Sequence, residues 1–281
     1  MKTWMAVFLS SITLLGNAQV SKYPAVCTSG DRQIWQTKRT MVQNLDTLPV
    51  AQRLVAVGQS FGGTPYQSHT LEVTSDEQLV VNLRGLDCTT FVESALALVL
   101  QSDPTFEGYC QALQRLRYRN DTLDGYPSRL HYLSDWLYEN QRKGTLQIIT
   151  DQLGGQPFDK SLRFMTTHRA AYRQLEEPRN YEALRQVEAS LTQRHLSYLP
   201  KDRVQRVESQ LRDGDLLAIT TSLGGLDASH VGFAVRRNGR VHLLHASSEA
   251  GKVIVSRQPL AEYLLAHPTQ TGLMVARLAV R

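Results

Sequence analysis

Residues 86–98 read Leu-Asp-Cys-Thr-Thr-Phe-Val-Glu-Ser-Ala-Leu-Ala-Leu, and this stretch decides the fold. From Phe91 onward, apolar side chains recur at intervals of three and four residues, which predicts a helix with a buried face. Asp87 is a good N-cap residue, so Cys88 should lie in the first helical turn. There the unpaired backbone amides and the helix dipole favour the thiolate, the nucleophilic form of cysteine. Cys88 is therefore a candidate nucleophile, with a small buried core residue as the alternative interpretation.

A β-hairpin is expected in the last third of the chain, where Asn238-Gly239 forms a tight-turn pair between two apolar segments. The sequence pattern predicts strands at 216–220, 229–236, 241–247 and 252–257, and an extended segment at 67–84. Apolar spacing and Gly or Pro stops predict helices at 36–60, 109–118, 130–140, 159–175 and 181–191. Helices together with an antiparallel sheet define the α+β class.

The register of this hairpin brings two histidines together. If the turn holds two residues, His230 and His245 project from one face as diagonal neighbours, with backbones about 7 Å apart. Gly232 and Ala234 share that face and are small, which leaves room for the helix tip bearing Cys88, while the opposite face of the strand is core. His230 could then take the proton from the thiol, and His245 could orient the ring of His230. The alternative is that both are ordinary strand histidines.

The first 18 residues resemble a cleaved secretory signal. One lysine precedes a mostly apolar run, and Gly16-Asn17-Ala18 offers small residues for a signal peptidase. We therefore expect an exported protein without a stable membrane anchor, whose mature chain begins near Gln19.

Composition argues against several other classes of protein. The net charge of +5 is spread along the chain without a dense basic block, so a nucleic-acid partner is not expected. No metal-ligand spacing is present, and neither a metal nor another cofactor is expected. The three cysteines do not form a disulfide framework, and a bond between Cys27 and Cys110 is left open, as is the oligomeric state.

Several blocks of the chain resemble a known family. The Asp87-Cys88 pair and the two histidine strands are similar to the NlpC/P60 superfamily of papain-like cysteine peptidases, as is the Gly-Thr-Pro-Tyr segment ending at Tyr66. More closely, the chain resembles the DUF1460 branch of N-acetylmuramoyl-L-alanine amidases, over about residues 40–280. The matching blocks are 86–93, 128–136, 164–165 with His168, and 225–227 before His230.

This resemblance implies a papain-like core and a cysteine amidase that cuts the muramoyl-L-alanine bond of peptidoglycan fragments, with anhydro-muropeptides as the expected substrates. It also implies a periplasmic enzyme in which 19–281 form a single catalytic domain with a helical elaboration at about 102–210. It implies Cys88, His230 and His245 as catalytic residues. The Cys88 amide and the Tyr66 hydroxyl would hold the oxyanion. The alternatives are an endopeptidase that cuts within the stem peptide and a non-catalytic muropeptide-binding protein.

The substrate-binding candidates come from the same blocks. Arg129 could bind a peptide carboxylate, and His131 and Trp136 lie beside it, with an aromatic ring available to stack on a sugar. A helix-packing role for these three residues is equally compatible with the sequence. The remaining candidates are Asp87, Thr89 and Asp227.

Overall fold

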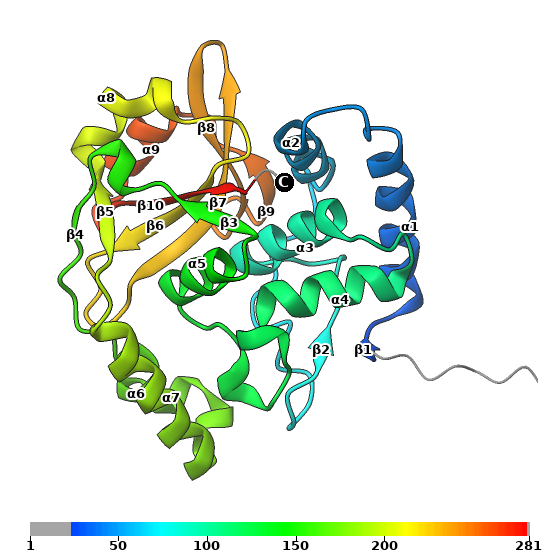
Figure 1. Ribbon diagram of the computed structural model, residues 1–281, viewed down its shortest axis with the longest axis vertical. Helices are drawn as coiled ribbons and strands as arrows, with labels where there is room; N and C mark the ends of the chain where they lie inside the picture. Colours follow the sequence, from blue (N-terminus) through cyan, green and yellow to red (C-terminus); the bar gives the residue numbers. More distant parts are fainter. Residues whose placement is uncertain (1–23, 280–281) are drawn as a thin grey trace, which may run out of the picture.

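The computed structural model describes residues 24–279, so the expected signal sequence at 1–18 lies outside the described residues. Its centre is an eight-stranded antiparallel sheet in the order β4-β5-β10-β6-β7-β8-β9, with β3 paired to β10 (Figure 1). The strands are β3 (Leu146–Ile148), β4 (Gln156–Pro157), β5 (Ser197–Pro200), β6 (Leu216–Thr221), β7 (Ala228–Arg237), β8 (Arg240–Ser247), β9 (Lys252–Val255) and β10 (Gln270–Leu278). A separate parallel pair is formed by β1 (Ala25–Val26) and β2 (Leu79–Val80).

Helices cover both faces of the main sheet, which confirms the α+β class (Figure 1). On one side lie α1 (Ser29–Gln43), α2 (Val50–Ser60), α3 (Cys88–Leu100), α4 (Phe106–Arg117) and α5 (Leu133–Arg142), and on the other α8 (Val204–Val207) and α9 (Leu260–Ala266). The remaining two, α6 (Phe164–Thr167) and α7 (Pro178–Thr192), extend from one end of the molecule. Within residues 24–279, no helix has the length and apolar character that a membrane crossing requires.

The core is divided by the sheet because alternate side chains of each strand point to opposite faces. In β6, Leu216 and Ala218 belong to the large apolar cluster under α3, whereas Leu217 and Ile219 belong to the cluster under α9. Residues 90–99 of α3 are all buried. A helix that is apolar all round is stable only in the interior of the molecule, so α3 is a rigid support for the cysteine at its tip.

The predicted strands of the C-terminal region are confirmed as β6 to β9, but other predictions need correction. The expected helix at 36–60 is two helices, because Pro49 disfavours helical backbone at the preceding residue and begins α2 instead. Of the segment expected to be extended at 67–84, only Leu79–Val80 forms a strand. The helix expected at 159–175 is reduced to α6 and short 3₁₀ turns, since only Leu162, Met165 and Leu175 of this stretch are buried apolar residues.

The middle section at 102–210 is also less helical than expected. Three of its segments, β3, β4 and β5, join the main sheet. Its α6–α7 part has an apolar cluster of its own, formed by Tyr126, Tyr132, Leu162, Met165, Leu175, Leu184 and Leu191. This section is therefore built into the fold and brings a second wall close to the tip of α3.

Candidate active site

The tip of α3 is held by a reciprocal cap. The Asp87 carboxylate accepts a hydrogen bond from the Thr90 amide at 2.7 Å, and the Thr90 hydroxyl oxygen accepts one from the Asp87 amide at 2.9 Å. This capping box satisfies amides that the first helical turn leaves without partners. It confirms the predicted N-cap and fixes Cys88 as the first residue of the helix.

The thiol of Cys88 is turned toward strand β7. The sulfur lies 4.0 Å from the Thr89 hydroxyl, and the backbone amide of Val231, the residue after His230, is close enough to favour the thiolate. Burial is the main cause that raises the pKa of the Cys88 thiol to about 12, and the negative charge of Asp87 raises it further. The expected stabilisation of the thiolate by the helix tip is thus outweighed, and the resting thiol is neutral.

Strands β7 and β8 have the predicted register but separate at one end. They pair from Arg237–Arg240 to Phe233–Leu244, whereas His245 and the residues after it pair with β9. Gly232 lies where the two strands part, and a Cβ there would come within 2.6 Å of the Leu244 carbonyl oxygen. Only glycine therefore allows β8 to approach so closely.

His230 on β7 and His245 on β8 lie where the two strands separate, and their side chains are hydrogen-bonded to each other. His230 Nε2 is 2.6 Å from His245 Nδ1, and the rings meet edge to face with centroids 4.8 Å apart. This contact confirms that they are neighbours on one face. It leaves Nδ1 as the His230 nitrogen available to a proton donor. The next residue on β7 is Val231, whose amide favours the Cys88 thiolate.

Both imidazoles are neutral over a wide pH range. Burial is the main cause that lowers the pKa of His230 to about 4, with a contribution from the positive charge of His267. Burial likewise lowers the pKa of His245 to about 3, and the charges of His230 and His267 lower it further. The site therefore combines a neutral thiol with a neutral base.

The body of α3 packs against the face of β7 that was expected to be core. The Phe91 ring lies against Phe233 with centroids 5.6 Å apart. The bulky Val231 and Phe233 side chains form a better apolar seat for the helix than the small residues near the histidines. Cys88 itself approaches β7 from its position at the tip of α3.

Tyr66 lies beside the cysteine on the loop that precedes α3. Its amide donates to the Gly251 carbonyl at 2.8 Å, and the segment also bridges to Leu86 just before the helix. Burial raises the pKa of the Tyr66 hydroxyl to about 12, and the charges of Cys88 and Asp87 raise it further. The hydroxyl therefore keeps its proton and can donate a hydrogen bond near the sulfur.

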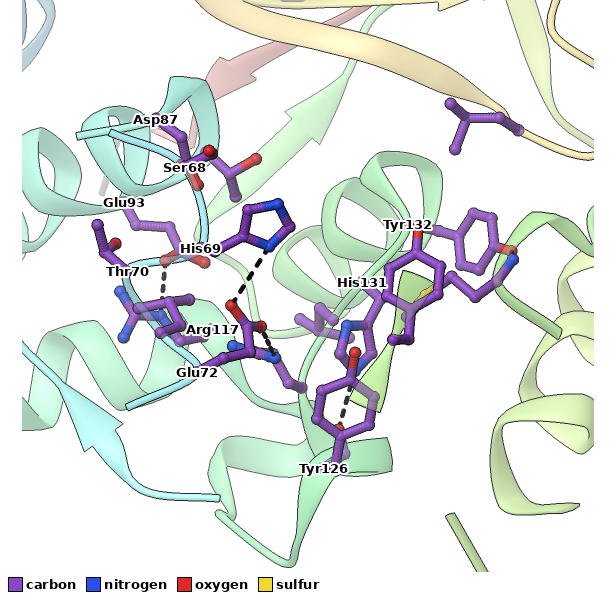
Figure 2. A pocket seen from close by; sticks show the side chains of 17 residues that line it. Ser68, His69, Thr70, Glu72, Asp87, Glu93, Arg117, Tyr126, His131 and Tyr132 are labelled. Atoms are coloured by element: carbon purple, nitrogen blue, oxygen red, sulfur yellow. Dashed lines mark hydrogen bonds and ion pairs between the residues drawn. The ribbon is translucent and has the colours of Figure 1, made fainter. Parts of the chain in front are cut away.

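A pocket of about 250 Å³ opens next to the tip of α3 (Figure 2). Asp87 and Ser68 lie toward one end of it, and Tyr126, His131 and Tyr132 toward the other. The full lining is Ser68, His69, Thr70, Leu71, Glu72, Asp87, Thr89, Glu93, Arg117, Tyr126, Arg129, Leu130, His131, Tyr132, Met165, Tyr172 and Leu226. The 86–93 block, the 126–132 loop and the α6 region thus enclose a single cavity.

The structure corrects two of the expected binding residues. Trp136 is 1% exposed and donates its indole N–H to Glu93, so its ring has no face available for a sugar. Arg129 lines the pocket, but its guanidinium is paired with Glu72 at 2.6 Å and lies 3.5 Å from Glu77, so it is not a free cation.

Four further candidates are placed as follows. His131 and Thr89 line the pocket, and the His131 Nε2–H donates to the Tyr126 carbonyl at 2.9 Å. Asp87 also lines it while capping α3. Asp227 is fully buried and accepts hydrogen bonds from the Ser134 and Ala228 amides, so it supports the loop behind the pocket.

Sequence reasoning missed part of this site. Residues 68–72 form one wall of the pocket and are an irregular segment without periodicity. Their position before the cysteine block is the only sequence signal for this wall. Tyr263 and His267 were also missed, although their spacing of four residues on α9 indicates neighbouring side chains.

Comparisons with known proteins show the family to which the chain belongs. A family model described as AmiA-like, N-acetylmuramoyl-L-alanine amidase-like, matches residues 56–272, and the chain belongs to this family. A crystal structure of an N-acetylmuramoyl-L-alanine amidase from Bacteroides uniformis is 36% identical, with a TM-score of 0.79 over 82% of this chain and 98% of that chain.

Two other solved structures are similar. One, from Bacteroides fragilis and provisionally named a xylanase, is 40% identical with a TM-score of 0.75, covering 79% of this chain and 99% of that chain. Another, a Legionella pneumophila protein assigned to DUF1460, is 23% identical with a TM-score of 0.68 over 89% of this chain and 96% of that chain, which shows the shared fold. No curated protein matches the chain.

Proposed function

We propose that this chain is a cysteine amidase that hydrolyses the bond between the muramoyl lactyl group and L-alanine in peptidoglycan fragments, with anhydro-muropeptides as the expected substrates. The observation that carries the proposal is the arrangement of side chains where β7 and β8 separate. His230 is hydrogen-bonded to His245 at 2.6 Å, and the amide of the next residue, Val231, favours the thiolate of Cys88. A thiol, a base and an orienting group are the minimum set for nucleophilic acyl transfer.

In this mechanism the proton leaves the thiol as the sulfur attacks. Nδ1 of His230 takes the proton of Cys88 while the sulfur bonds to the lactyl carbonyl carbon, so no thiolate accumulates beforehand. The Cys88 amide and the Tyr66 hydroxyl donate to the developing oxyanion. His230 then gives its proton to the amine of L-alanine, and water, activated by the same ring, hydrolyses the thioester.

The charges of the pocket favour the sugar end of the substrate. Arg117 is bonded to Glu93 at 2.7 Å, and Arg129 is paired with Glu72. Because each lining guanidinium already faces a carboxylate, the pocket suits a neutral group with many hydroxyls better than an anionic peptide. The rings of Tyr126, Tyr132 and Tyr172 add apolar faces of the kind that sugars contact.

A glycosidase is disfavoured by the same contacts. Glycoside hydrolysis needs two carboxyl groups free to act as acid and as base or nucleophile. Here Asp87 caps α3, Glu93 binds Arg117 and Trp136, and Glu72 binds Arg129. The lining carboxyls are therefore committed to structural partners.

The remaining parts of the proposal concern ancestry and location. We propose that the α3 tip and the β7–β8 histidines are the papain-like core of the NlpC/P60 superfamily, with 19–281 as one catalytic domain. The apolar run at 4–15 supports export to the periplasm, where soluble peptidoglycan fragments are found.

Mass analysis of the products from a defined anhydro-muropeptide tests the function. We expect wild-type protein to release the intact stem peptide with a free alanine amine, and Cys88→Ala to release nothing while keeping its circular dichroism spectrum. Cleavage within the stem peptide would establish the endopeptidase instead. Binding without turnover by the wild type would indicate a binding protein.

A further inference from the structure

The far side of His245 contacts an aromatic residue that the catalytic scheme does not use. His245 is 1% exposed, its Nδ1 faces His230, and its Nε2 has no hydrogen-bond partner within residues 24–279. Its ring meets Tyr263 of α9 edge to face, with centroids 5.6 Å apart and planes at 76°.

The position of the proton on His245 decides whether His230 can act as a base. For Nδ1 of His230 to accept a proton, its Nε2–H must donate to Nδ1 of His245, which then carries its own proton on Nε2. In the reverse arrangement His245 donates from Nδ1, and His230 holds a proton on its own Nδ1, the nitrogen that the proposed mechanism assigns as the base. Because a buried N–H without a partner is unfavourable, the productive arrangement needs something to support the His245 Nε2–H.

We propose that Tyr263 is the positioning residue that holds His245 in the productive tautomer, with its π-face receiving the Nε2–H. Aromatic faces carry partial negative charge and accept N–H groups weakly. The inference rests on the proposed function, since it concerns the base in that reaction. Tyr263 acts only through His245 and is not itself catalytic.

Tyr263 is fixed on its other sides. Its ring packs against His267 with centroids 4.3 Å apart and planes at 39°, and the His267 Nδ1–H donates to the Tyr263 carbonyl at 2.6 Å. The side chain of Gln270, at the start of β10, interacts with the Tyr263 hydroxyl. A ring held by a helix, a strand and a second ring is a rigid platform for His245.

Several charged groups surround this platform. Glu249 lies 3.7 Å from Nε2 of His267, and the Lys201 ammonium donates to the His267 carbonyl at 3.3 Å. The charge of Glu249 raises the pKa of the Tyr263 hydroxyl, the Cys88 thiol lies near enough to interact with it, and His230 faces His245 from β7. A substitution at Tyr263 removes none of these charged groups, so a change in activity reports on the loss of the aromatic face.

The experiment compares Tyr263→Leu, which removes the aromatic face, with Tyr263→Phe, which keeps it. For Tyr263→Leu we expect kcat on a defined muropeptide to fall about 10- to 100-fold, as for other groups that orient a ligand or base from behind, with KM unchanged. Tyr263→Phe should stay near the wild-type rate, and Leu265→Ala, an exposed change on the same helix, is the matched control.

A spectroscopic readout makes the test independent of the substrate. Long-range ¹⁵N spectra of histidine-labelled protein report which ring nitrogen carries the proton, and Tyr263→Leu should shift His230 toward its Nδ1–H form. Unchanged tautomers with wild-type kcat in Tyr263→Leu would overturn the proposal, as would an equal loss in Tyr263→Phe. If Tyr263→Leu does not fold, Tyr263→Met supplies bulk without a π-face and is read in the same way. Failure of the amidase assignment would appear in the products, whereas failure of this inference would appear in the spectra.

Discussion

At the scale of single residues, Cys88 is subject to opposing influences. The α3 tip and the Val231 amide favour its anion, whereas burial and the charge of Asp87 oppose it more strongly. His230 is similarly kept neutral by burial and by the charge of His267. In the proposed mechanism the cysteine therefore becomes nucleophilic only while it transfers its proton, which would limit its reactivity toward other electrophiles.

The ultraviolet absorbance of the thiolate checks this directly. We expect the difference spectrum between the wild type and Cys88→Ser to show no thiolate band at pH 7, because the thiol pKa is raised to about 12 by burial. The subtraction removes any contribution of Cys27 and Cys110. A thiolate band at neutral pH would mean that the thiol and an imidazole form a resting ion pair.

Tyr66→Phe should remove one donor to the oxyanion while leaving the loop in place, since Tyr66 is held through its backbone. Loss of such a donor lowers kcat by about 100- to 1000-fold, with little change in KM. Steady-state kinetics measure the effect, and Tyr138→Phe, an exposed tyrosine on α5, serves as the control. An unchanged kcat would leave the backbone amide of Cys88 as the only donor from our proposal.

The sequence predicted the histidine pair because a two-residue turn fixes the register of both strands locally. It did not predict the state of Arg129 and Trp136, since Glu72, Glu77 and Glu93 meet them only after long-range folding. Residue type alone therefore suggested binding groups that the fold uses for internal hydrogen bonds.

At the scale of elements, α3 depends on its N-terminal cap. Its residues from Thr90 to Val99 are all buried, so they make no surface contacts that could replace the stabilisation from the cap. We expect Asp87→Ala to lower the free energy of unfolding by about 0.5–2 kcal/mol, the usual cost of losing an N-cap. Chemical denaturation measures this loss.

Asp87→Asn separates the two effects of this residue. It retains an oxygen that can accept from the Thr90 amide, so it should keep most of the stability. Because the charge of Asp87 raises the pKa of Cys88, the same change should lower that pKa and speed alkylation of the thiol. Equal destabilisation by both substitutions would show that the charge, rather than the cap, matters.

The longest strand that the sequence did not predict is β10. Its first residues, Gln270, Thr271 and Gly272, follow Pro268-Thr269 and look like a turn. Moreover, Leu273 to Ala276 are all buried, so the alternation typical of a half-exposed strand is missing. By contrast, β7 and β8 were recognisable from the turn between them.

At the scale of the whole molecule, buried neutral histidines make stability depend on pH. The pKa values of His131, His230 and His245 are lowered to about 3, 4 and 3, chiefly by burial. Between these values and the unfolded value near 6.5, the unfolded chain binds more protons than the folded protein. Each histidine therefore contributes stability that is complete above pH 6.5 and is lost as the pH falls.

The substitution His131→Gln isolates one such group, and glutamine can still donate to the Tyr126 carbonyl. From pH 7 to pH 5, the wild type should lose about 2 kcal/mol more unfolding free energy than the variant. Urea denaturation at the two pH values gives this difference. Parallel behaviour of the two proteins would mean that His131 is not held neutral in the folded state.

Strand β10 lies between β6 on one side and β5 with β3 on the other, and all three of these neighbours precede it in the chain. While the ribosome is still adding residues 270–278, a nascent polypeptide can form the β6–β9 meander, but the outer edge of β6 has nothing to pair with. Closure of the sheet must therefore wait until translation has passed Leu278. Until then the chain is incompletely folded, and an unfolded chain is the state that a protein-conducting channel accepts.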